Sequence, residues 1–428
     1  MGGKRMTALI IPTQSEVPEP VPPQAAQWSS VVQFGLSALA IFILWSLAFS
    51  ALLIGLSARL GSLGGVSLGA ADDLQLFLVA GGLAFCGLLL LPSAGYSLAR
   101  LTGRPVQQSP AIFRRLRPTL LIFLFPLLVG AGYWVSQNSA ISWLLLPPIH
   151  VLAVSLPILW LAYLAVRDLP LGSPQRAWGS FASGLALSPL LILAAELVAL
   201  LMGLGAWILV VVMRPELVEA VNDLAERLSA AASSPEIVLR ILQPVVSNPL
   251  VIFTVLVFGA VIVPLIEEAL KPMGVWLLAG RKLVPAEGFA LGALSGTGYA
   301  LIESLFLASN SQDWAFVIFA RIGTSAMHIL TAGMVGWALA SAWQSGRYAR
   351  LGATYLLAVL LHGLWNGLTL TNLFAGVIET PASGPGLFIQ IGEIAPYLLG
   401  GLAGAALLII LWVNRALLQS ANKDRENL

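Results

Sequence analysis

The stretch VPLIEEALKPMGVWLL (residues 263–278) decides the fold class, because it places charged side chains in a segment that is otherwise apolar. The charged residues are Glu267, Glu268 and Lys271. The apolar run covers 249–279, which is longer than the about 20 residues that a helix needs to cross the hydrocarbon core. A charge at the bilayer centre costs about 2.5–3.5 kcal/mol even on lenient insertion scales, so such residues are rare unless they face a functional interior. The stretch therefore predicts a membrane-spanning helix with a polar face turned toward the protein.

The composition of the whole chain agrees with this prediction. Of 428 residues, 58% are hydrophobic and 10% are charged, against about 25% charged in an average soluble domain. A soluble protein cannot cover that much apolar surface, and the net charge of +2 gives no argument for nucleic-acid binding. The single Cys86 excludes a disulfide within the chain and argues against cysteine-ligated metal. A metal site must therefore use His150, His328 or His362 together with oxygen ligands.

We predict an all-α polytopic transmembrane bundle with about ten spans. The predicted spans are 30–56, 75–99, 118–136, 142–166, 185–213, 249–279, 287–308, 314–343, 351–372 and 388–413. The loop after the second span holds five arginines and no acid, and every second loop after it is also basic. The positive-inside rule then places both termini in the cytoplasm, which agrees with an even number of spans.

These spans divide the chain into five regions. Residues 1–29 form a flexible Pro-rich tail, and 30–213 form an N-terminal region of five spans. Residues 214–248 form an outer-face loop whose apolar residues repeat at helical spacing, so we expect one or two amphipathic helices that act as a surface strut or as a lid. Residues 249–413 form a C-terminal core of five spans, and 414–428 form a cytoplasmic tail.

Polar residues recur at one depth on four consecutive spans of the C-terminal core. Glu267, Glu303, His328, His362 and Asn366 lie 11 to 16 residues from the predicted cytoplasmic ends of their helices. At 1.5 Å rise per residue these offsets are roughly 16–24 Å, so the side chains meet near mid-membrane. Carboxylates can take a proton from water, and imidazoles can hold a metal or stabilise an oxyanion. The pattern predicts a polar centre with the parts of a hydrolase.

Four motifs in order resemble the PrsW family of intramembrane proteases. They are EEALK (267–271), YALIE (299–303), the isolated His328 and HGLWN (362–366), where the family shows EExxK, FxxxE, a lone His and HxxxD/N. The family is related to the wider CAAX-protease and bacteriocin-processing group, which has EExxxR in the first motif. The resemblance covers about 267–366. Tyr299 stands where the family usually has Phe, and Asn366 is the neutral choice within the pattern.

The resemblance implies hydrolysis of a peptide bond in or near a membrane span. The expected substrate is a membrane-anchored protein such as an anti-sigma factor, and the expected location is the plasma (inner) membrane of a prokaryote. The expected partners are thus this substrate and the lipid bilayer, with no nucleic acid. The family also implies a divalent metal, with zinc as the expected ion.

Roles for the site residues follow from the resemblance together with helical spacing. Glu267 or Glu268 is expected to activate the water, and Glu267 is preferred because it lies at i,i+4 from Lys271. Lys271 would orient a glutamate, and Asn366 would donate a hydrogen bond to the oxyanion. The metal ligands or transition-state stabilisers would be Glu303, His328 and His362.

Other interpretations remain open at this point. Glu303 could form a structural ion pair with Arg321, the two glutamates could form one with Lys271, and His328 could be a satisfied core histidine. We take His150, Glu196 and Glu393 as structural. The chain has no HExxH, and its GALSG and GTSA stretches do not match the GxSG turn of serine intramembrane proteases. A proton- or ion-coupled transporter would also use intramembrane acids and histidines, and a non-catalytic scaffold of the same family could retain all four motifs.

Overall fold

The computed structural model describes residues 23–61, 70–104, 122–232, 234–306, 314–378 and 386–426, and within them the chain is helical with no strand. The first half comprises α1 (Pro23–Arg59), α2 (Ala70–Leu101), α5 (Leu124–Ser136), α6 (Ser139–Val166), α7 (Pro174–Ala182), the π-helix η1 (Ser183–Leu187) and α8 (Ser188–Val212). The second half comprises α9 (Pro215–Ala230), α10 (Pro235–Val246), α11 (Pro249–Val257), the π-helix η2 (Phe258–Ile262), α12 (Val263–Leu270), α13 (Met273–Trp276), α14 (Pro285–Phe306), α15 (Trp314–Ser345), α16 (Tyr348–Val377) and α17 (Leu387–Glu426).

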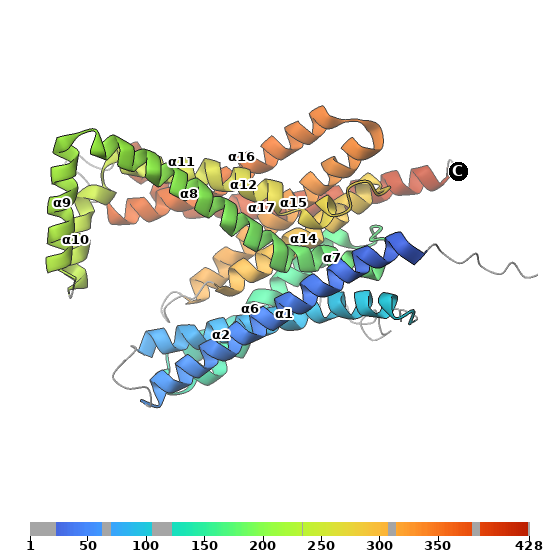
Figure 1. Ribbon diagram of the computed structural model, residues 1–428, viewed down its shortest axis with the longest axis horizontal. Coiled ribbons are helices and arrows are strands. Elements are labelled where there is room, and N and C mark those ends of the chain that lie inside the picture. Colours follow the sequence, from blue (N-terminus) through green and yellow to red (C-terminus); the bar gives the residue numbers. More distant parts are fainter. Residues whose placement is uncertain are drawn as a thin grey trace, which may run out of the picture.

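Nine helices within the described residues are long and apolar enough to cross a membrane. They correspond to nine of the ten predicted spans and confirm an all-α polytopic bundle. The remaining predicted span, 118–136, is represented by the 13-residue α5, and its first residues lie outside the described part. Helix α1 begins and α17 ends at the same end of the bundle (Figure 1). The side of the membrane that this end faces stays a prediction.

Several helices extend beyond the boundaries predicted from hydropathy. The span predicted to start at residue 185 begins at Pro174, because α7, η1 and α8 are continuous. Helix α1 begins at Pro23 within the predicted tail, whose residues 1–22 lie outside the described part, and α17 continues to Glu426. A helix satisfies its backbone hydrogen bonds internally in lipid and in water alike, so a drop in hydropathy marks the membrane surface and not the helix end.

The segment 214–248 contains two short helices. Pro215 occupies the first turn of α9, where a missing backbone N–H costs nothing. Helices α9 and α10 stand at the end of the bundle opposite the start of α1 and the end of α17 (Figure 1). No described residue of α9 is buried. Whether this pair acts as a strut or as a lid stays a prediction.

Helix α14 lies at the centre of the bundle and is the most buried of the membrane-spanning helices. Gly288, Gly292 and Gly296 follow one another at intervals of four and face α15. A Cβ at Gly292 would meet the carbonyl oxygen of Ala332, so a side chain here would push the two helices apart. Small residues at such spacing let membrane helices approach closely, since lipid supplies no hydrophobic force between them. This close packing sets the distance between the polar side chains on α14 and α15.

Candidate active site

Helix α12 carries two of the polar residues and ends at the third. Glu267 and Glu268 lie in its last turn, and Lys271 follows as the C-terminal cap. The helix stops because Pro272 has no backbone N–H and its ring clashes with the preceding turn. The Lys271 carbonyl at this break accepts a hydrogen bond from Ser295 Oγ of α14 at 2.6 Å. A neighbouring helix thus satisfies a backbone carbonyl at the break.

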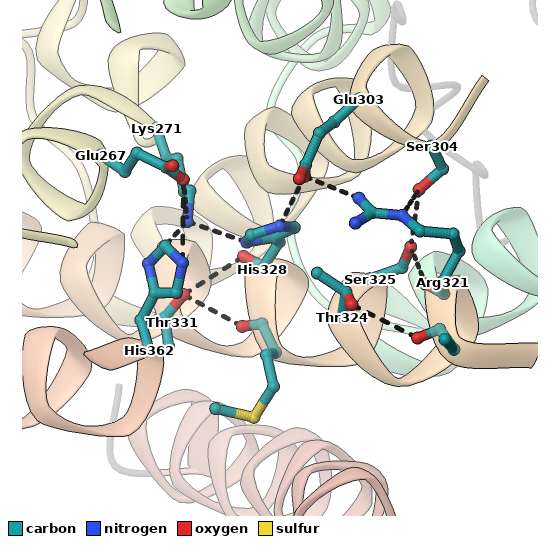
Figure 2. Close-up of polar contacts among 12 residues, drawn as sticks. Glu267, Lys271, Glu303, Ser304, Arg321, Thr324, Ser325, His328, Thr331 and His362 are labelled. Atoms are coloured by element: carbon teal, nitrogen blue, oxygen red, sulfur yellow. Dashed lines mark hydrogen bonds and ion pairs between the residues drawn. The ribbon is translucent and has the colours of Figure 1, made fainter. Parts of the chain in front are cut away.

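The Lys271 ammonium lies at the centre of the polar cluster (Figure 2). Its Nζ is 2.8 Å from Glu267 Oε2, 2.8 Å from Glu268 Oε1 and 2.8 Å from His328 Nδ1. His362 Nδ1 is slightly more distant, at 3.2 Å. Lys271 and Glu268 are both 0% exposed. The ammonium hydrogen-bonds Glu268 and His328, and it forms an ion pair with Glu267.

These contacts assign the ring hydrogen of His328. Because His328 Nδ1 accepts from Lys271, its Nε2 carries the ring hydrogen and donates to Glu303 Oε2 at 2.7 Å. His328 is therefore neutral, which is the form that binds metals. His362 Nδ1 lies 2.9 Å from Glu268 Oε1 and 3.2 Å from Lys271 Nζ. Its Nε2 lies 4.0 Å from Glu267 Oε2.

Glu303 has two partners and lies at the margin of the cluster. Its Oε2 accepts from His328 and also pairs with Arg321 Nη2 at 2.8 Å. Arg321 is held in turn by Ser304 Oγ at 3.0 Å (Figure 2). The structural pair of Glu303 with Arg321 is thus present together with the contact to His328. The Glu303 side chain is 38% exposed, whereas those of Glu267 and both cluster histidines are at most 10% exposed.

Aromatic rings fix the positions of the charged groups. The ring of Tyr299 meets that of His328 edge-on at 5.2 Å, and His328 meets His362 in the same way at 5.4 Å. Lys271 Nζ lies 5.1 Å from the centre of the Tyr299 ring, close enough for a cation–π attraction. The Tyr299 hydroxyl is a hydrogen-bond partner of Glu267. The tyrosine thus contacts the cluster through both its ring and its hydroxyl.

Asn366 lies beside the cluster and contacts the backbone. Its Nδ2 donates to the carbonyl oxygen of Gly259 at 2.9 Å. Gly259 belongs to η2, and a π-helical turn shifts the hydrogen-bond pattern by one residue and can leave a carbonyl without its usual donor. Gly363 packs directly on the carbonyl of Ala260 in the same turn. Asn366 therefore ties α16 to the segment that leads into Glu267.

The buried groups carry a surplus negative charge. Glu267 and Glu268 share the single positive charge of Lys271, while Arg321 balances Glu303. Glu268 Oε2 is buried and has no hydrogen-bond partner within the described residues. Buried charges are costly unless paired, so this arrangement favours a further positive charge.

Three of the side chains form a possible metal site. Glu267, His328 and His362 each offer one ligand atom, and these atoms lie within 4.8 Å of one another. One carboxylate and two imidazoles are the donor set of several catalytic zinc sites. The donor set and the surplus negative charge both fit a divalent cation. Glu267, His328 and His362 would hold such an ion, and all three also contact the Lys271 ammonium.

Six of the seven residues selected from the sequence lie together in the structure. Their contacts differ from the roles expected for Glu303 and Glu267. Glu303 contacts the outer nitrogen of His328, and Glu267 faces the space between the two histidines. Glu196 of α8, expected to be structural, has a carboxylate that interacts electrostatically with Glu267, Lys271 and Glu303. An acid within a membrane span is the sequence signal for this residue, but its helix carries no motif.

Other polar residues occupy structural positions. His150 Nδ1 accepts a hydrogen bond from Trp314 Nε1 at 3.2 Å, in agreement with a structural role. Ser295 donates to the Lys271 carbonyl, and Ser325 donates to the Arg321 carbonyl at 2.6 Å. Neither hydroxyl is arranged as a nucleophile beside a histidine.

Comparison with known proteins places one region of the chain in a family. Residues 193–390 match the model of the PrsW family intramembrane metalloprotease. This region is a PrsW-family domain. It runs from α8 into α17 and contains every residue of the cluster, so the protein is a multi-pass membrane protease and a peptide hydrolase. Searches of curated proteins and of solved structures find no match to the chain.

Proposed function

We propose that the protein is a metal-dependent intramembrane protease that cleaves a membrane-anchored protein resembling an anti-sigma factor. The observation that carries the proposal is the buried group of Glu267, His328 and His362 inside a PrsW-family domain. The substrate class and the location, the plasma membrane of a prokaryote, rest on the family resemblance. The bilayer itself would deliver such a substrate, because the cluster lies between membrane-spanning helices.

Glu267, His328 and His362 would hold the metal, and zinc is the ion that this donor set favours. A bound divalent metal supplies Lewis-acid polarisation of the scissile carbonyl. Glu303 would fix the ring of His328 through the hydrogen bond at 2.7 Å. Partners of this kind orient a ligating histidine and raise its basicity.

Glu268 is then the base that takes a proton from the attacking water. Its Oε1 is held by Lys271 and His362, and its Oε2 is not engaged by any described residue. Helical spacing alone favoured Glu267 as the base, whereas the geometry supports Glu267 as a metal ligand. Once protonated, Glu268 can pass the proton to the leaving amine, as a carboxylate does in general acid–base catalysis.

Asn366 is proposed to stabilise the oxyanion. An amide nitrogen carries two hydrogens, so Nδ2 can hold the Gly259 carbonyl and donate its second hydrogen to substrate. Lys271 positions both glutamates and keeps their separation fixed.

The test is cleavage of a single-span reporter protein by the purified enzyme in lipid vesicles. Glu268→Gln and Glu267→Gln should each lower the rate by about 100-fold or more, the usual contribution of a positioned acid–base group. Glu393→Gln is the matched control, because it makes the same chemical change at an exposed position of α17 and should cleave at the wild-type rate. Full cleavage by both cluster variants would end this assignment. Ion flux that fails in the variants while cleavage is absent in all proteins would favour the transporter.

A further inference from the structure

A cavity lies between α1, α2, α7, η1 and the residues around α13, and none of the cluster residues lines it. Its volume is about 450 Å³. Arg100, Arg176 and Arg281 line part of it, and no aspartate or glutamate among the described residues does. Neutral polar and apolar side chains line the rest, and the apolar ones include Val32, Leu36, Leu90, Leu187 and Leu277.

The arginines leave positive charge in this cavity. Arg176 pairs with Glu287, so its charge is balanced. Arg100 Nη1 donates at 3.0 Å to Gln175 Oε1, which is neutral. Arg281 is exposed, and the described residues provide no acid that pairs with it. Two guanidinium groups thus remain for an anion, and guanidinium is well suited to phosphate oxygens.

Neutral hydrogen-bonding groups lie between the arginines and the apolar wall. Gln33 Nε2 donates to Ser93 Oγ at 3.0 Å and to the Gln175 carbonyl at 3.1 Å, which joins α1, α2 and α7. Ser37 and Ser93 are 3.0 Å apart. Groups of this kind suit the glycerol and ester oxygens of a lipid.

The cavity extends along the helix axes of α1 and α2. Arg100 lies in the last turn of α2, and Leu90 lies ten residues earlier, which is roughly 15 Å deeper at 1.5 Å per residue. On α1, Trp28 and Leu36 are separated by eight residues, or roughly 12 Å. Val32 and Leu36 are 54% and 46% exposed, so this side of the cavity opens toward the surrounding lipid.

We propose that this cavity binds one anionic phospholipid. The phosphate lies between Arg100 and Arg281, and an acyl chain runs along Leu36 and Leu90 toward the membrane interior. A water-soluble phosphate ester offers the same charge but leaves the apolar wall uncovered, and a zwitterionic lipid carries a cationic group that the arginines repel. Basic pockets between membrane helices are a recurring mode of anionic-lipid recognition.

The experiment measures lipid retained by the full-length protein. The protein is reconstituted in vesicles of phosphatidylglycerol and phosphatidylcholine, extracted in mild detergent and analysed by native mass spectrometry. The wild type should retain phosphatidylglycerol in preference to phosphatidylcholine. Arg100→Gln/Arg281→Gln should lower the retained phosphatidylglycerol by about tenfold or more, since each basic residue adds to the attraction for an anionic headgroup.

Arg347→Gln/Arg350→Gln is the matched control, because it removes the same charge at exposed positions outside the cavity and should retain lipid as the wild type does. Arg281→Gln alone removes an exposed side chain without breaking the contact of Arg100 with Gln175, so it tests the site even if the double variant unfolds. Equal retention by wild type and both cavity variants overturns the proposal. Displacement of the lipid by glycerol phosphate shows a site for soluble phosphate esters and overturns it as well.

Discussion

Lys271 balances one of the two carboxylate charges that α12 buries, and it does so at 0% exposure. The same ammonium contacts His328, one of the three side chains that would hold a metal. At the scale of single residues, the charge balance of the site therefore depends on whether the Lys271 ammonium or a metal ion faces Glu267. This dependence makes the lysine the most informative residue for stability measurements.

Lys271→Met should destabilise the protein, because two buried carboxylates lose their positive partner. Removing one member of a buried ion pair costs about 3–5 kcal/mol, so the midpoint of thermal unfolding in detergent should fall clearly below that of the wild type. Added Zn²⁺ should restore part of the loss by replacing the missing charge. An unchanged unfolding midpoint in the absence of metal would contradict the central position of Lys271.

Glu303→Gln separates a positioning role from direct metal ligation. The glutamine retains an oxygen for His328 and Arg321 but loses the charge, so cleavage of the reporter should fall by about 10- to 100-fold, as for other partners of ligating histidines. Metal content at saturating metal should remain that of the wild type. Loss of the metal in this variant would instead make Glu303 a ligand, as the resemblance suggested.

The membership of the cluster could be predicted from the sequence, but its internal contacts could not. Common depth follows from counting residues along helices, and it selected His328 and His362 correctly as neighbours of Lys271. The contact of Glu303 with the outer nitrogen of His328 depends on how α14 and α15 rotate about their axes. Hydropathy does not determine that rotation, because α14 is buried on nearly all sides.

At the scale of helices, the close approach of α14 and α15 holds Glu303 against His328. Gly292→Ala should weaken this contact, because the new methyl group meets the Ala332 carbonyl. Overpacking of this kind costs about 1–3 kcal/mol, so both thermal stability and cleavage should fall. Gly203→Ala on α8 is the matched control, since a methyl group there meets open space. Equal behaviour of the two variants would show that this packing does not position the site.

Hydropathy does not predict where the membrane-spanning helices are interrupted. The apolar stretch at 249–279 predicts one continuous helix, whereas the structure contains the π-helix η2 and a break at Pro272. The π-helix depends on Asn366 to satisfy the Gly259 carbonyl, and the break depends on Ser295. Such interruptions are stable only when distant segments supply the missing hydrogen bonds, so a local pattern does not reveal them.

At the scale of the whole molecule, the basic loops predict that the first turn of α16 faces the cytoplasm and that the α9–α10 connection faces outward. Cys86 is 0% exposed, so the native chain should give no background with a membrane-impermeant maleimide. A cysteine in place of the exposed Ala232 should react on intact cells, and one in place of the exposed Arg347 should react only after permeabilisation. The reverse labelling pattern would invert the predicted orientation.

The metal content of the purified protein tests the account most directly. Mass spectrometry should find about one zinc per chain in the wild type and in Glu393→Gln, as a single site with one carboxylate and two imidazoles requires. His328→Ala/His362→Ala should lose it, and reporter cleavage should disappear with the metal. Equal metal in the double variant and the wild type, or none in the wild type after metal is supplied during purification, would contradict a metal centre at Glu267, His328 and His362.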